Sequence, residues 1–257
     1  MPPPRPLPLS SRFEALDALR GLAVVWMTVY HFCFDLNHFG YLRQDFLGDA
    51  FWTSQRTAIV SLFLFCAGMG QAAAQLQSRG APRFWQRWAQ IAACALLVSA
   101  ASWLIFPASF IYFGVLHAIA VMLLVVQPLS RWGQRHPLWL AVLATVLLLL
   151  PLAAPGLLVS SGLQDLFNSR ALNWLGWISR KPFTEDYVPL LPWAGVMVWG
   201  LLVGQAVLRK PPDWLMAPLP GGGRPLIWLG RHSLGWYMLH QPVLMGLLAS
   251  ASWLIRP

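Results

Sequence analysis

Long apolar stretches recur along the whole chain, and short polar segments separate them. A helix needs about 20 mostly apolar residues to cross the roughly 30 Å hydrocarbon core of a membrane. Seven stretches meet this requirement, and we expect spanning helices at 17–37, 56–75, 85–106, 110–129, 137–157, 188–208 and 233–254. The segment 226–230 predicts a short interfacial helix before the last span. The pattern therefore predicts an all-α, polytopic transmembrane helical bundle of about seven spans, with eight as the alternative.

The regions outside these spans are short. Residues 1–11 are rich in proline, and we expect a disordered cytoplasmic tail there. The largest outer segment, 158–187, is too short to form an independent domain. We therefore expect residues 12–257 to form a single transmembrane domain, in which any chemistry takes place within the bundle or at its two mouths.

The composition agrees with a membrane protein. Apolar residues make up 57% of the chain and charged residues only 11%, whereas a soluble domain carries about 25% charged residues. This difference excludes a soluble globule. The net charge of +9 does not indicate a nucleic-acid partner, because the basic residues cluster between apolar runs, as membrane topology requires. With a cytoplasmic N-terminus, 12 of the 18 basic residues lie on the inner side: Arg5, Arg12, Arg20, Arg79, Arg83, Arg87, Arg131, Arg135, Arg209, Lys210, Arg224 and Arg231.

One face of the first predicted span is polar. At 100° per residue, six of its side chains fall within a stripe of roughly 80°. They are Asp17, Arg20, Thr28, His31, Asp35 and His38. Ionisable groups at membrane depth are costly unless they are paired or hydrated. We therefore expect this stripe to face the bundle interior and to line a cavity or a path.

His31 and Asp35 are separated by four residues, so their side chains are neighbours on a helix. A carboxylate in this position can hold an imidazole in one tautomer, and this pairing predicts a general base. The alternative is a polar pair that only tightens helix packing. A metal site formed by His31, Asp35 and His38 is a weaker alternative, because no other span supplies a complementary cluster. The cysteines, Cys33, Cys66 and Cys94, form no C-x-x-C pair.

The other polar residues at membrane depth allow two interpretations each. His117 and His240, in the fourth and last spans, could bind a ligand or make hydrogen bonds between helices. Asp186 and Tyr187 precede the sixth span and predict either an outer rim that binds a polar acceptor or an interfacial anchor. Arg20 and Arg231 lie toward the inner face, where positive-inside bias explains most arginines, but a guanidinium also binds phosphate in a bidentate way.

The order of these motifs resembles a known family. Residues 12–23 (RFEALDALRGLA), followed by Tyr30-His31 and Phe34-Asp35-Leu36, are similar to bacterial members of the heparan-α-glucosaminide N-acetyltransferase catalytic-domain family. A similar opening followed by a histidine also occurs in bacterial membrane O-acyltransferases. Further segments resemble the first family and extend the similarity over nearly the whole chain: 113–117 (FGVLH), 186–193 (DYVPLLPW), 228–234 (WLGRHSL) and 240–242 (HQP).

The resemblance implies a transmembrane acyltransferase of the bacterial inner membrane. It would use acetyl-CoA from the cytoplasmic side, without a metal, to acetylate an amine or a hydroxyl of an extracytoplasmic saccharide. On this reading His31, Asp35 and His38 are catalytic, with His31 or else His38 as the base. The remaining candidates bind the two substrates: Arg20, Arg231 and His240 the CoA ester, and His117, Asp186 and Tyr187 the acceptor.

Two other functions remain open at this point. The polar stripe could be the relay of a transporter or proton-coupled channel. Its residues could also do no more than join helices in a structural membrane subunit. The expected partners are the lipid bilayer, the CoA ester and the saccharide, with no nucleic acid, and a homo-oligomer is compatible with the sequence.

Overall fold

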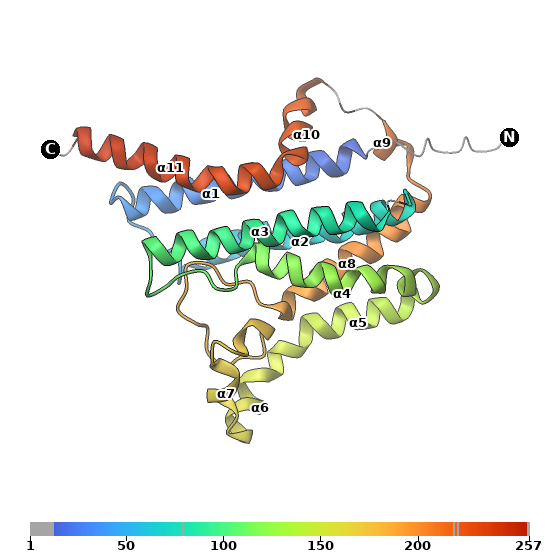
Figure 1. Cartoon of the computed structure of the whole chain (residues 1–257), viewed down its shortest axis with the longest axis horizontal. Helices are drawn as coiled ribbons and strands as arrows, with labels where there is room; N and C mark the ends of the chain where they lie inside the picture. Colours follow the sequence, from blue (N-terminus) through green and yellow to red (C-terminus); the bar gives the residue numbers. More distant parts are fainter. Residues whose placement is uncertain (1–12, 79, 218, 220, 256–257) are drawn as a thin grey trace.

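The computed structural model describes residues 13–78, 80–217, 219 and 221–255. Long helices dominate this part of the chain (Figure 1), which confirms the predicted all-α class: α1 (Glu14–His38), α2 (Ala50–Leu76), α3 (Ala81–Ile105), α4 (Val115–Arg135), α5 (Pro137–Leu149), α8 (Leu190–Arg209) and α11 (Ser233–Ile255). Short helical segments join them: η1 (Leu150–Ala153), α6 (Ala154–Ser161), α7 (Gln164–Asn168), η2 (Asn173–Leu175), α9 (Asp213–Met216), η3 (Gly221–Gly223) and α10 (Arg224–Arg231). The predicted tail at 1–11 lies outside the described residues.

Five segments of the described chain are long and apolar enough to cross a membrane: α2, α3, α4, the continuous run Pro137–Ser161 and α8. They correspond to five of the seven predicted spans. The other two predicted spans are present as the long helices α1 and α11, which do not meet the same length and hydropathy criterion over the described residues. The structure therefore shows a helical membrane protein, and a total of seven crossings remains a prediction.

Two helix boundaries differ from the sequence prediction because capping decides where a helix begins. Helix α2 starts six residues before the predicted 56–75, since the side chain of Asp49 accepts a hydrogen bond from the backbone N–H of Phe51. Helix α4 starts five residues after the predicted start at 110, because residues 106–114 form an irregular segment that pairs with another loop. The predicted interfacial segment 226–230 lies within α10.

Helices α2 and α8 pack very closely at the centre of the molecule. A Cβ atom added to Gly68 would collide with the backbone of Met197, and one added to Gly200 would collide with the backbone of Phe65. Small residues at membrane helix interfaces allow such close approach, which dispersion and backbone contacts then stabilise. Buried side chains from α2, α4, α5 and α8 form the main apolar core around this pair.

Helices α1, α10 and α11 form a second unit along one side of the bundle (Figure 1). Helix α10 packs against the first half of α1, where Gly21 contacts the backbone of Leu226 and Gly230 contacts the backbone of Asp17. Helix α11 then runs beside the second half of α1 in the same direction. Because α10 and α11 follow each other directly, the chain places residues 233–255 against the polar stripe of α1.

The segments between helices also pair at one end of the bundle. Phe113 and Tyr187 form an isolated parallel bridge, and the N–H of Glu185 donates to the carbonyl of Ser109 over 2.9 Å. The side chains of Ser109 and Glu185 are also hydrogen-bonded. These contacts join the segment before α4 to the segment before α8, so the two helix entrances are held together.

Candidate functional site

The polar stripe of α1 meets α11 at Asp35. This carboxylate is almost completely buried, with 1% of its surface exposed, and its Oδ1 atom accepts a hydrogen bond of 2.7 Å from Nε2 of Gln241. Its other oxygen, Oδ2, is buried and has no hydrogen-bond partner among the described residues, and the same holds for Oε1 of Gln241. Buried polar atoms without partners are rare in folded proteins and mark places where a ligand can bind.

His240 lies in the same interface. It is 7% exposed, and its ring contacts that of His31 edge to face, with 5.1 Å between ring centroids. Atom Nδ1 of His240 is 2.8 Å from the carbonyl oxygen of Tyr237, whereas Nε2 is buried and makes no hydrogen bond in the described part of the chain. Together His31, Asp35, His240 and Gln241 form what we call the interface cluster.

One expectation about these residues is wrong in the structure. Asp35 does not orient His31, because the Asp35 carboxylate is turned toward Gln241 and no hydrogen bond joins it to His31. Their four-residue spacing made them neighbours on α1, but the partner of the carboxylate is supplied by α11. His240 lies alongside His31 in the helix interface, and its expected role in binding the CoA ester remains a prediction.

His38 is the last residue of α1 and lies outside the interface cluster. Its side chain is exposed, and its ring contacts that of Phe39 at 5.4 Å between centroids. Seven residues separate it from His31, which is about 10 Å along the helix axis. The structure thus places His31 in the helix interface and His38 at the end of the helix.

Arg20 and Arg231 lie together near the start of α1, and both contact Asp17. Arg20 Nη1 is 3.3 Å from Asp17 Oδ1, and Arg231 Nε is 3.2 Å from Asp17 Oδ2. Arg231 also approaches Oε1 of Glu14 at 3.6 Å. Arg87 of α3 is close enough for its charge to interact with that of Arg20. This group of three arginines, Asp17 and Glu14 therefore carries one excess positive charge.

The three predicted acceptor-binding residues, His117, Asp186 and Tyr187, hold the start of α4 and its neighbouring loop. Oδ2 of Asp186 accepts a hydrogen bond of 2.9 Å from the N–H of Val115, the first residue of α4. Nδ1 of His117 accepts from the N–H of Gly114 over 3.3 Å, and its Nε2 is 3.0 Å from Oγ of Ser99. The hydroxyl of Tyr187 donates to the carbonyl of Asn173 over 2.6 Å.

The titration of these loop residues reflects their burial. Desolvation raises the pKa of Asp186 above its usual value, although the hydrogen bond from Val115 and the charges of Arg56 and Lys181 act in the opposite direction. Desolvation also raises the pKa of the Tyr187 hydroxyl. Asp186 is near enough to Tyr237 for an electrostatic interaction, and the Tyr237 ring contacts His240 at 5.8 Å between centroids. The loop therefore borders the interface cluster.

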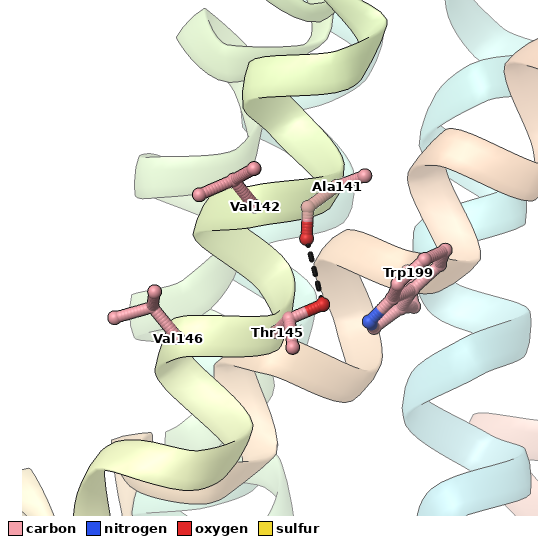
Figure 2. A pocket seen from close by; sticks show the side chains of 5 residues that line it. All are labelled: Ala141, Val142, Thr145, Val146 and Trp199. Carbon is pink, nitrogen blue, oxygen red and sulfur yellow. Dashed lines mark hydrogen bonds between the residues drawn. The ribbon is translucent and has the colours of Figure 1, made fainter.

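Other parts of the described chain offer less chemistry. No group of three or more His, Cys, Asp or Glu residues there could hold a metal ion. A shallow hollow between α5 and α8 is lined by Ala141, Val142, Thr145, Val146 and Trp199 (Figure 2), and the Thr145 hydroxyl already donates to the carbonyl of Ala141 over 2.9 Å. This hollow contains no titratable side chain, so the interface cluster is the better candidate.

Sequence reasoning missed one member of the cluster, Gln241. It belongs to the His240-Gln241-Pro242 segment, so its position beside a membrane-depth histidine was a usable signal. Its partner could not be read from the sequence, because 206 positions separate Gln241 from Asp35.

The fold and the site together define an integral membrane protein of long helices with a buried imidazole and carboxylate cluster between two of them. Residues 12–242 match the family model described as heparan-alpha-glucosaminide N-acetyltransferase, catalytic. Because this match covers most of the chain, the protein belongs to that family, which points to a transmembrane acyltransferase. No curated protein and no solved structure matches the chain.

Proposed function

We propose that this protein transfers an acetyl group from cytoplasmic acetyl-CoA to an amine or a hydroxyl of an extracytoplasmic saccharide. The observation that supports the proposal is the interface cluster. The family gives the reaction class. The cluster contains a buried imidazole and a buried carboxylate, and each keeps one atom without a partner among the described residues. A proton acceptor of this kind typically contributes about 10²- to 10⁴-fold to the rate of acyl transfer.

The donor would bind with its phosphates near Arg20, Arg87 and Arg231. The excess positive charge of this group supports phosphate binding, although a phosphate has to compete with Asp17 and Glu14 for Arg20 and Arg231. Arg20 lies 11 residues before His31 on α1, about 16 Å along the axis. The thioester arm of the donor would therefore extend along the polar face of α1 to reach the cluster.

The acceptor would enter from the side of the loop that holds Asp186 and Tyr187. Because the known contacts of Asp186, Tyr187 and His117 stabilise the start of α4, we propose that these residues shape the acceptor mouth. His38, exposed at the end of α1, is placed where it can contact an acceptor before the acceptor reaches His31. On the positive-inside rule, this end of the bundle faces away from the cytoplasm of a bacterial cell.

The test uses the purified full chain in liposomes, with acetyl-CoA on one side and a panel of amine- and hydroxyl-bearing sugars on the other. We expect free CoA and an acetylated sugar to appear in equal amounts, and only when both substrates are present. Flux of protons or of solute without an acetylated product would instead favour the transporter. The absence of both an acetylated product and flux would favour the structural subunit. Flux without product, or the absence of both, would overturn the proposal.

A further inference from the structure

The hydrogen bonding of His240 defines the protonation state of its ring. A backbone carbonyl oxygen can only accept a hydrogen bond, so the 2.8 Å contact between Nδ1 of His240 and the Tyr237 carbonyl requires the hydrogen to be on Nδ1. A neutral imidazole carries one N–H, so Nε2 of His240 is then unprotonated and presents its lone pair. The backbone of α11 thus prepares this side chain to take up a proton at Nε2.

The surroundings of Nε2 leave that lone pair free. The atom is buried and accepts no hydrogen bond from any described residue. Around the His240 ring lie the rings of His31, at 5.1 Å, and Tyr237, at 5.8 Å, both measured between centroids. Oδ2 of Asp35 and Oε1 of Gln241 are further buried acceptors without partners in the same helix interface. The interface therefore offers several acceptors to a group that donates hydrogens.

His31 differs from His240 in this respect. Neither of its ring nitrogens makes a hydrogen bond to a carbonyl or carboxylate in the described chain, and Asp35, four positions further along α1, is bound to Gln241. His117 differs too, since both of its ring nitrogens are engaged near the start of α4. Of the histidines discussed at membrane depth, His240 combines a defined tautomer, burial and a free Nε2 atom.

We propose that His240, acting through Nε2, is the proton acceptor in acetyl transfer; this inference rests on the proposed function. The acceptor's nitrogen or oxygen attacks the thioester carbonyl carbon and forms the new C–N or C–O bond, while its proton moves to Nε2. When the tetrahedral intermediate collapses, the C–S bond breaks and the CoA sulfur takes that proton from Nε2. His31 lies against the ring that becomes charged and acts as a positioning residue.

The first test measures the tautomer and needs no substrate. Nitrogen NMR of the ¹⁵N-histidine-labelled full chain, with the His240 signals assigned from the His240→Gln spectrum, should show a protonated Nδ1 and an unprotonated Nε2 at neutral pH. A hydrogen on Nε2 in the resting protein would overturn the proposal.

The second test compares single-turnover acetyl transfer in three histidine variants. His240→Ala should slow transfer by about 10²- to 10⁴-fold, leave CoA-ester binding within threefold, and regain activity when free imidazole is added. His31→Ala should lose less activity and gain nothing from imidazole. The matched control is His232→Ala, because His232 makes the same 2.8 Å Nδ1 contact to a backbone carbonyl, that of Trp228, but is exposed. It should transfer acetyl groups at the normal rate.

The outcomes separate this inference from the proposed function. A wild-type protein that transfers acetyl groups while folded His240→Ala retains normal turnover would overturn the inference alone. A wild-type protein without acetyl transfer to any acceptor would overturn both. Where thermal melting shows that His240→Ala does not fold, His240→Gln replaces it, since glutamine preserves a polar side chain without a titratable nitrogen.

Discussion

At the scale of single residues, polar side chains in this protein divide into those that complete the fold and those that remain free. Asp186 belongs to the first kind, because it supplies the hydrogen-bond acceptor that the first N–H of α4 lacks. Asp35 belongs to both kinds, since Gln241 holds one of its oxygens and the other has no partner in the described chain. Burial alone therefore does not single out a candidate functional residue here, and a buried atom without a partner in the described chain is the more selective signal.

The cap formed by Asp186 predicts a pH dependence. Desolvation raises the pKa of Asp186 in the folded protein, so its contribution to stability is fully present below the unfolded value of 3.8 and is lost as the pH rises through the folded pKa. Asp186→Asn keeps an acceptor oxygen for Val115 but does not titrate. We therefore expect the melting temperature of the wild type to fall relative to that of Asp186→Asn between pH 4 and pH 7.

Thermal melting of both proteins in detergent across this pH range measures the effect. Asp186→Ala serves as the control, because it removes the cap and should cost about 1 kcal/mol at neutral pH. A constant difference between wild type and Asp186→Asn would show that the charge of Asp186 has no net effect on stability.

At the scale of elements, close backbone contacts determine that α10 and α11 pack against α1. Gly21 and Gly230 allow the backbones of α1 and α10 to touch, and α10 leads directly into α11. Once α10 is docked, α11 follows α1 in the same direction, and the hydrogen bonds from Trp236 to Thr28 (2.8 Å) and from Gln241 to Asp35 (2.7 Å) become possible. The interface cluster thus depends on two glycines that lie away from it.

Gly230→Ala should disturb this docking. The added Cβ would collide with the backbone of Asp17, and overpacking of this kind costs about 1–3 kcal/mol. We expect a lower melting temperature and, because α11 shifts with α10, weaker acetyl transfer. Gly235→Ala is the matched control: no atom lies within 4 Å of its added Cβ, so stability should be unchanged or slightly improved. Equal melting temperatures for the two variants would contradict the packing argument.

At the scale of the whole molecule, five long apolar segments share one bundle with the long helices α1 and α11. Helices α1 and α11 run in the same direction, so their first residues lie at one face and their last residues at the other (Figure 1). The Tyr41 and Ser252 hydroxyls, 3.0 Å apart, confirm that this register continues to the far end. The excess of basic residues near the first of these faces predicts that this face lies toward the cytoplasm.

This arrangement predicts that the C-terminus is extracytoplasmic. We expect a cysteine placed after Pro257 to react with a membrane-impermeant thiol reagent in intact cells, whereas a cysteine at Pro211, just beyond α8, should react only after permeabilisation. The background is a full chain in which Cys33, Cys66 and Cys94 are replaced by serine. Labelling of the Pro211 position alone in intact cells would show that the orientation is the reverse of the predicted one. Labelling of neither position, or of both, would show that position 211 and the C-terminus lie on the same side of the membrane.

The helices and their approximate extents could be predicted from the sequence, because both depend on local properties. Apolar length decides which segments can cross a membrane, and the backbone hydrogen bonds of a helix lie within the segment itself. The shared face of His31 and Asp35 follows in the same way from helix periodicity. The start of α4 was less predictable, because its cap comes from Asp186, 71 positions away.

The partners across helices were decided only by the tertiary structure. The sequence by itself determined an all-α membrane protein, a polar stripe on its first long helix and the family to which its motifs belong. It did not determine that Asp35 binds Gln241, that His31 meets His240 or that Asp17 pairs with Arg231. Side-chain pairing depends on the rotation and register of two helices, and in a membrane these are set by small-residue contacts and polar pairs between distant segments, since lipid provides little hydrophobic force to bring helices together.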